Sequence, residues 1–219
     1  MLDILKQQAT GTGQNWLQIL ILLTVLALIP TILIMTTSFT RIVVILSFAR
    51  NALGTHNMPP NQIIIGIALF LTIFIMAPTF TQINNEAVQP YLKGQITQEQ
   101  AFKNAEIPMK NFMLKQTREK DLSLFINLSK LEKPKKASDV PLTVLIPAFI
   151  ISELRVAFQI GFLIYLPFLL IDFIVASVLM SMGMMMVPPI MISLPFKVLL
   201  FVMVDGWYLI TNSIVNTFK

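Results

Sequence analysis

Apolar and charged positions divide the chain into long blocks. No charged residue lies between positions 7 and 40, and residues 16–35 are nearly continuously apolar, which is long enough for a membrane helix of about 20 residues. A second apolar block covers about 62–83, and residues 141–218 are again apolar with a break at 183–189. This pattern predicts an all-α membrane protein with four long hydrophobic helical segments arranged in two hairpins.

A different pattern fills residues 84–140, which hold 17 of the 27 charged side chains. Thr97 precedes Gln100 by three positions, the spacing of a helix-capping box. Apolar residues then recur at spacings of three and four, which predicts short amphipathic helices; they are Met109, Phe112, Met113, Leu124, Phe125, Leu128 and Leu131. Local core packing is the simpler interpretation, and Phe112 and Phe125 are also candidates for a subunit contact. We therefore expect three regions: 1–83, 84–140 and 141–219.

The orientation of the segments is not settled by charge. Arg41 and Arg50 flank what the pattern suggests is a short connection before Pro59-Pro60, where a helix should start. Those arginines favour a cytoplasmic connection, which would place residues 84–140 outside the cytoplasm. The ten Lys and Arg of residues 84–140 instead favour the cytoplasmic side for their own region. The two signals conflict.

The third apolar block is too long for one simple span. A helix over 143–182 would be roughly 60 Å long, about twice the hydrocarbon thickness. It must bend, extend beyond the bilayer or divide near Pro167.

Charges inside the apolar C-terminal blocks require partners, because an unpaired charge costs roughly 2.5 to 3.5 kcal/mol on insertion scales. Lys197 is the most constrained, with Glu153 and Asp172 as candidate partners. A hairpin would offset Asp172 from Lys197 by roughly 7 Å in depth. We expect an ion pair that supports assembly, with Glu153 as the first choice, reached through a bend near Pro167 or from a neighbouring subunit.

Composition supports a membrane location. Hydrophobic residues make up 55% of the chain and charged residues 12%, against about a quarter charged in soluble domains. The formal charge of +5 comes from dispersed residues without aromatic platforms, so nucleic-acid binding is not expected. Cysteine is absent and His56 stands alone, so no metal site or cofactor is expected. No nucleophile motif or phosphate-binding glycine loop indicates an enzyme.

The first apolar block could be a secretory signal peptide. Asp3 lies beside Lys6 in the preceding region, and no convincing small-residue cleavage site follows. Retention as a membrane segment is the favoured interpretation.

Methionines cluster at the break between the last two blocks. Six of the 13 lie between positions 180 and 191, with Met184, Met185 and Met186 consecutive. They could fill irregular gaps between packed helices, because methionine is unbranched and adaptable. Gly183 and Pro188-Pro189 frame the triplet as a non-helical loop, however, and such backbone at membrane depth is tolerated where protein buries it or where it lines a cavity. The loop therefore favours a pore lining.

Several stretches together resemble the FliP family over essentially the whole chain. These are 41 onward, 58–62, 76–80, 147–154, 157–162, 182–189, 195–197 and 205–207. The resemblance implies a homopentameric subunit that joins FliQ and FliR in the flagellar type III export gate at the basal body, in the bacterial inner membrane. It also implies FlhB and FlhA as neighbours, membrane lipid as surroundings and unfolded flagellar proteins as the exported cargo.

The family likeness also bears on the site and the topology. It implies that residues 84–140 are extracytoplasmic and that the methionine loop matches the constriction of the family's channel. Virulence secretion systems contain a related subunit, SctR, and some family members have a cleaved leader. A proton-coupled transporter or ion channel using Glu153, Asp172 and Asp205 is the main alternative, and a scaffold without a pore is another.

Overall fold

A computed structural model describes residues 16, 19, 20, 23, 24, 26–28, 30–55, 58–129, 139–184 and 186–218. Within these residues every regular element is a helix and no strand occurs, so the predicted all-α class is confirmed. The chain divides into two units, Met1–Met35 and Thr36–Lys219. The described residues of the first unit are helical up to Met35, and their apolar side chains are exposed.

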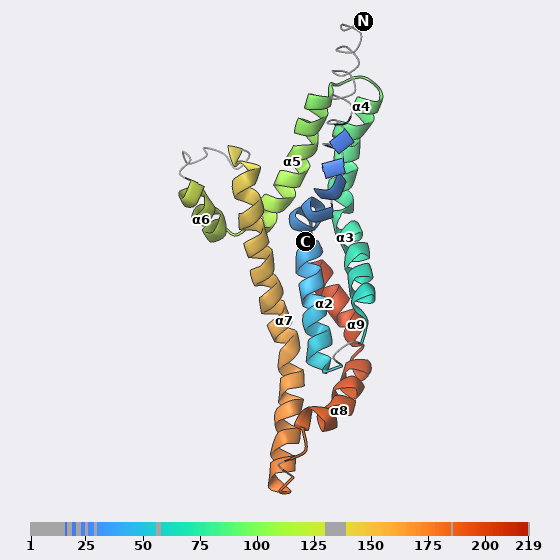
Figure 1. The fold of residues 1–219 in the computed structure, drawn as a ribbon, viewed down its shortest axis with the longest axis vertical. Coiled ribbons are helices and arrows are strands. Elements are labelled where there is room, and N and C mark those ends of the chain that lie inside the picture. Colours follow the sequence, from blue (N-terminus) through green and yellow to red (C-terminus); the bar gives the residue numbers. More distant parts are fainter. Residues whose placement is uncertain are drawn as a thin grey trace, which may run out of the picture. The chain divides into compact units, whose positions relative to one another are not determined.

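The second unit is a helical bundle (Figure 1). Its elements, in chain order, are α2 (Phe39–Leu53), α3 (Asn61–Ile83), the π-helix η1 (Asn84–Val88), α4 (Gln89–Leu92), α5 (Gln98–Gln116), α6 (Glu119–Ser129), α7 (Leu142–Ser181), α8 (Pro189–Met203) and α9 (Gly206–Asn216).

Helix α2 supplies half of the buried residues of the main core. It packs against α3, α7, α8 and α9, and Ile42, Ile45 and Leu46 have no exposed surface. The approach to α7 is close at Gly161, where an added Cβ would lie 2.6 Å from the ring of Phe48. Because Gly161 has no Cβ, the Phe48 ring of α2 packs directly against the backbone of α7.

The prediction of a short connection between Arg41 and Arg50 is wrong, because both arginines belong to α2. Arg41 is buried, with 2% of its surface exposed. The helix ends at Gly54, whose φ of 75° places it in the left-handed region. A charge enclosed by protein on all sides carries no information about membrane orientation, so Arg41 does not count toward a cytoplasmic loop.

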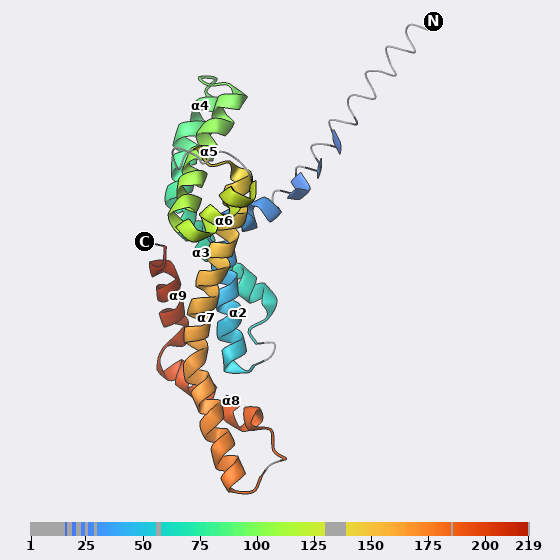
Figure 2. The ribbon, with the colours of Figure 1, turned by 90° about the vertical axis from the view of Figure 1, so that its left-hand side faces the viewer.

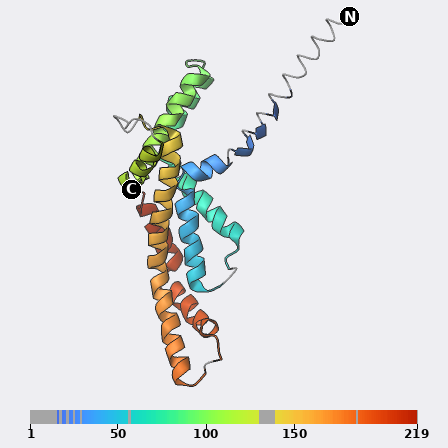
Figure 3. The same ribbon diagram turned by 60° about the vertical axis from the view of Figure 1, so that its left-hand side comes forward.

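Two predicted starting signals are confirmed. Helix α3 begins at Asn61, directly after the proline pair, and continues through η1 and α4. Helix α5 begins with the capping box: Thr97 Oγ1 accepts from the Gln100 N–H, and Gln100 Oε1 accepts from the Thr97 N–H at 3.0 Å. Figure 3 shows α5 descending to the upper part of α7, and α5 packs against both α3 and α7.

Helix α7 is the longest element, with 40 residues and a length of about 60 Å. It continues through Pro147 and Pro167, so the option of a division near Pro167 is wrong. Phe168 packs against Phe201 of α8, with ring centroids 6.3 Å apart, which supports the helix just past the proline. Figure 2 shows α7 running from the level of α6 down past α8.

Helices α8 and α9 meet at a corner of 63°. Asp205 forms this corner with a φ of 50°, an uncommon left-handed conformation for a residue other than glycine. At Gly206 an added Cβ would lie 2.3 Å from the ring of Phe201. The ring thus packs directly on the backbone of Gly206 and fills the space inside the corner.

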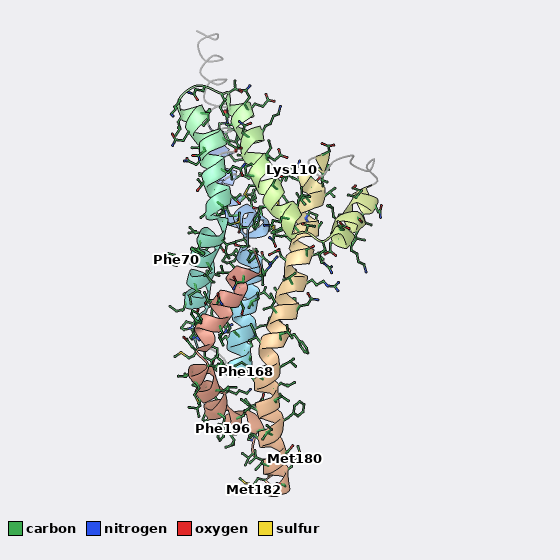
Figure 4. The ribbon with its side chains drawn as sticks, turned by 180° about the vertical axis from the view of Figure 1, so that it is seen from behind. Phe70, Lys110, Phe168, Met180, Met182 and Phe196 are labelled. Atoms are coloured by element: carbon green, nitrogen blue, oxygen red, sulfur yellow. The ribbon has the colours of Figure 1, made fainter. Side chains whose placement is uncertain are left out.

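Length and composition give two to four candidate membrane spans in the part of the chain that the structure describes. Asn61–Leu92 and α7 qualify alone, and the count rises to four if two bent helix pairs, one of them α8 with α9, each form one span. Large apolar side chains on α3 are exposed, among them Phe70 at 77% (Figure 4). Such a surface requires lipid or partner subunits to cover it.

Candidate functional site: a methionine loop and two buried ion pairs

The predicted break at 183–189 is a loop at the tip of the α7–α8 hairpin. Helix α7 ends at Ser181 and α8 starts at Pro189. Gly183 has a φ of 75°, its N–H donates to Met180 O at 3.0 Å, and the Met184 N–H donates to Leu179 O at 2.9 Å. This pair of bonds is a Schellman motif, in which glycine adopts the left-handed position. Gly183 therefore ends α7.

The other side of the loop is set by the two prolines. Pro188 has an extended backbone conformation, and Pro189 is the first residue of α8. Proline suits this position because its missing N–H would have no partner in a first helical turn. Met184 and Met186 thus lie outside both helices.

Methionine side chains surround this tip. Met186 is 98% exposed, and Met180, Met182 and Met191 are also mostly exposed; Figure 4 shows Met180 and Met182 at the end of α7. Met184 is partly covered, and Met185 lies outside the described residues. In the subunit these side chains do not fill a helix interface, so the tip offers a flexible apolar surface.

Lys197 on α8 pairs with Asp172 on α7. Lys197 Nζ lies 2.6 Å from Asp172 Oδ2, and the Ser193 hydroxyl donates to Asp172 Oδ1 at 2.5 Å. A Cβ at Gly54 would lie 3.8 Å from Nζ, so the ammonium also sits beside the C-terminal end of α2, where the helix dipole favours a cation. The first-choice pairing of Lys197 with Glu153 is therefore wrong within the subunit, and the second choice is observed.

The reason lies in the true ends of the hairpin. Asp172 is nine residues before the end of α7, and Lys197 is eight residues after the start of α8. At about 1.5 Å per residue, their depths measured from the loop differ by roughly one residue, or about 1.5 Å, instead of the expected 7 Å. The expected offset of roughly 7 Å counted part of the predicted break at 183–189 toward helix length, whereas α7 already ends at Ser181 and α8 starts at Pro189.

Glu153 pairs with Arg41, a site residue that sequence reasoning missed. Arg41 Nε donates to Glu153 Oε2 at 2.9 Å, and Nη2 contacts Glu153 Oε1. Arg41 also donates to Gln116 Oε1 at 3.0 Å and to the backbone carbonyl of Thr217 at 3.1 Å. Both members of the pair are almost fully buried. One guanidinium thus joins α2, α5, α7 and the turn after α9.

Ser152, the neighbour of Glu153, joins a second network. Its hydroxyl donates to Asp121 Oδ2 on α6 at 2.6 Å and accepts from the Arg118 N–H at 3.1 Å. Arg118 also pairs with Asp121 at 2.7 Å. Burial raises the pKa of Asp121, but the hydrogen bonds from Ser152 and Arg118 and the charges of Arg118 and Arg155 outweigh it, so the pKa lies below its ordinary value of 3.8.

This shift predicts acid sensitivity at the α6–α7 contact. A depressed folded-state pKa adds stability above the unfolded-state value, and that stability is lost as the pH falls through the folded value. Asp121→Asn should therefore lower the apparent melting temperature at pH 7, and the difference from wild type should shrink below about pH 4. Glu99→Gln, which changes an exposed pair with Lys103, is the control. A difference that is constant down to pH 2.5 would contradict the assignment.

Phe112 and Phe125 contact residues of their own subunit. Phe112 meets Phe149 edge to face at 6.0 Å and stacks on Phe218 at 6.4 Å. Phe125 packs against the smaller core cluster, which contains Met113, Val140, Val144, Leu145 and Phe149. Both rings keep some exposed surface. The subunit contact therefore stays a prediction.

These features define an all-α membrane protein whose C-terminal hairpin exposes a methionine loop at its tip and buries charged side chains along its flank. Among the described residues, no group of three or more His, Cys, Asp or Glu is arranged to hold a metal ion. The chain matches the FliP family over residues 22–214 and belongs to that family.

Relatives from three bacteria match nearly the full chain. The flagellar biosynthetic protein FliP of Bacillus subtilis (strain 168) is 60% identical over 217 residues, covering 99% of this chain and 98% of the relative. The protein of the same name from Aquifex aeolicus is 52% identical over 211 residues, covering 95% and 88%. That from Treponema denticola is 51% identical over 203 residues, covering 92% and 75%.

Proposed function

We propose that the chain is a core subunit of the flagellar type III protein export gate, through which unfolded flagellar proteins leave the cytoplasm. The full-length identity of 60% to a flagellar biosynthetic protein carries this proposal. In this proposal the subunit catalyses no reaction, and the energy for export comes from other components.

Met184, Met185 and Met186 form the constriction of the channel in this proposal. Two observations support it: the Schellman motif that fixes the start of the loop, and the nearly complete exposure of Met186 at the hairpin tip. Thioether side chains have several rotatable bonds and no directional hydrogen bonds. A ring of such loops would close on itself and yield to cargo of any sequence.

The assembly is a homopentamer with FliQ and FliR, next to FlhB and FlhA, in the inner membrane at the flagellar basal body. The exposed apolar surfaces support an assembly, since Phe70, Phe74, Phe162 and Phe173 are each at least 60% exposed in the single chain. The three-region division, with residues 84–140 extracytoplasmic, belongs to the same proposal. Glu153, Asp172 and Lys197 are its assembly residues, and Phe112 and Phe125 are the candidate contacts.

The proton-coupled alternative needs a carboxylate that is free to exchange protons with water. Glu153 and Asp172 are instead held by Arg41 and Lys197. The third carboxylate, Asp205, is exposed at the α8–α9 corner, but one exposed carboxylate does not form a proton path, so these observations do not favour a transporter over an export gate.

Replacing Met184, Met185 and Met186 together by alanine tests the constriction. Shorter side chains should leave an opening, so resting cells should leak ions and small solutes while the yield of purified complex stays near wild type. The matched control is Met76→Ala, because Met76 is fully buried in α3 and its truncation should lower yield by a loss of about 2–5 kcal/mol. Complexes that form normally and stay as tight as wild type would overturn the seal, and lost complexes would show that the loop methionines are packing residues.

A further inference from the structure

The turn after α9 is held by contacts that converge on one arginine. Arg41 Nη1 donates to the backbone oxygen of Thr217 at 3.1 Å and to its Oγ1 at 3.2 Å. The guanidinium carbon lies 3.9 Å from the centre of the Phe218 ring, and Phe112 of α5 stacks on the same ring. The turn is thus seated between α2 and α5.

Arg41 and Phe112 together form a specific binding site for this turn, which we call the seat. A helix C-terminus has carbonyls without partners inside the helix, and a cation there is favoured by the helix dipole. Phe218 adds a cation–π contact on the same guanidinium. Arg41 is oriented by its ion pair with Glu153, so the seat is preformed.

Helix α9 has little else to hold it against α7. A groove of about 560 Å³ lies between α7, α8 and α9 and reaches Ser213 and Thr217. The inner face of α9 is buried only at Gly206, Ile210 and Ile214. Loss of the seat would therefore leave the end of α9 attached through few contacts.

The other end of α9 is joined stiffly to α8. Phe201 occupies the space beside Gly206 and meets Trp207 edge to face at 5.2 Å. A displacement of α9 is therefore transmitted to α8, where it is opposed by the contacts of Lys197 with Asp172 and of Phe201 with Phe168. Helix α8 begins where the methionine loop ends.

We propose that Thr217 and Phe218 act as a latch: closed on Arg41 and Phe112, they hold α9, α8 and the methionine loop in the sealed position, and their release frees the loop to open. Because Phe112 belongs to α5 and Arg41 to α2, a shift of α5 relative to α2 removes the Phe112 side of the latch. This inference rests on the proposed function, since it assigns a control element to the same gate.

The test uses Thr217→Val with Phe218→Ala in the complete complex. The chain has no cysteine, so Ile210→Cys, at a site that is 6% exposed, reports α9 release through its labelling rate with a maleimide. The latch variant should label roughly tenfold faster than the reporter alone, because local opening no longer breaks the bond of Arg41 to Thr217 Oγ1 or its contact with the Phe218 ring. Phe102→Ala, at an exposed site on α5, is the control and should leave labelling unchanged.

A second measurement, the leak of small solutes from resting cells, reports on the gate. Faster labelling together with a leak supports the latch. Unchanged labelling overturns it, whatever the loop does. Faster labelling without a leak, while the triple-alanine loop variant leaks, overturns the coupling and leaves the proposed gate standing. If the triple-alanine variant is tight as well, the seal itself has failed, and the coupling fails with it.

Discussion

Arg41→Met should destabilise the subunit by about 3–5 kcal/mol, the range for removing one partner of a buried ion pair. The Glu153 carboxylate would remain with no exposed surface and no cation, while Gln116 and Thr217 would lose their donor. We expect a fall of about 10 °C or more in the apparent melting temperature of the detergent-purified protein. Arg41→Lys should recover little, because an ammonium cannot reproduce the forked contacts.

The double variant Arg41→Met with Glu153→Leu shows how much of the lost stability is due to the unpaired Glu153 carboxylate. Removing both charges should recover much of the loss, since an apolar pair needs no partner. Lys103→Met, on an exposed pair with Glu99, is the control and should change stability by less than about 1 kcal/mol. If the double variant is no more stable than Arg41→Met, the buried charge is not the cause of the loss.

Lys197→Met should prevent normal accumulation of the complex, because Asp172 would lose its ammonium partner and keep only the hydrogen bond from the Ser193 hydroxyl. Lys197→Asp should be worse, because two carboxylates would then face each other. Exchanging the charges, with Lys197→Asp and Asp172→Lys together, should restore part of the yield. The measurement is the amount of complex recovered from membranes relative to wild type.

Glu153→Lys combined with Lys197→Glu is the matched comparison. It should not recover, because Glu153 is bound to Arg41 on another side of α7, and its replacement would place two cations together. If this combination restores assembly and the Asp172 exchange does not, then Lys197 acts across the subunit boundary on Glu153.

Local signals in the sequence predicted local structure well. The capping box at Thr97, the helix start after Pro59-Pro60 and the break after Ser181 all depend on interactions within a few residues. A glycine in the left-handed position and a proline in a first helical turn determine the backbone conformation locally, without contacts from distant parts of the chain. The all-α class followed from the lengths of the apolar blocks.

Long-range features could not be predicted in this way. Arg41 and Glu153 lie 112 positions apart, and no periodicity connects them. A lone arginine at the edge of an apolar block has the same local pattern whether it faces water or is enclosed by four segments. Burial of α2 therefore had to be seen in the structure, and the same holds for the seat of Phe218.

The partner of Lys197 shows an intermediate case. The hairpin and its three candidate charges were predictable, but the pairing depended on where each helix ends. An error of a few residues in the loop shifts the expected depth by several ångströms, which was enough to favour the wrong carboxylate.

Ser152 and Glu153 are neighbours on α7 but serve different networks, one toward α6 and one toward α2. Adjacent helical residues point about 100° apart, so a single turn of α7 fixes its rotation about its own axis. One residue inserted or deleted between Pro147 and Ser152 would turn both groups away from their partners at once. During sequence divergence this part of the chain is therefore free to exchange apolar residues but not to change in length.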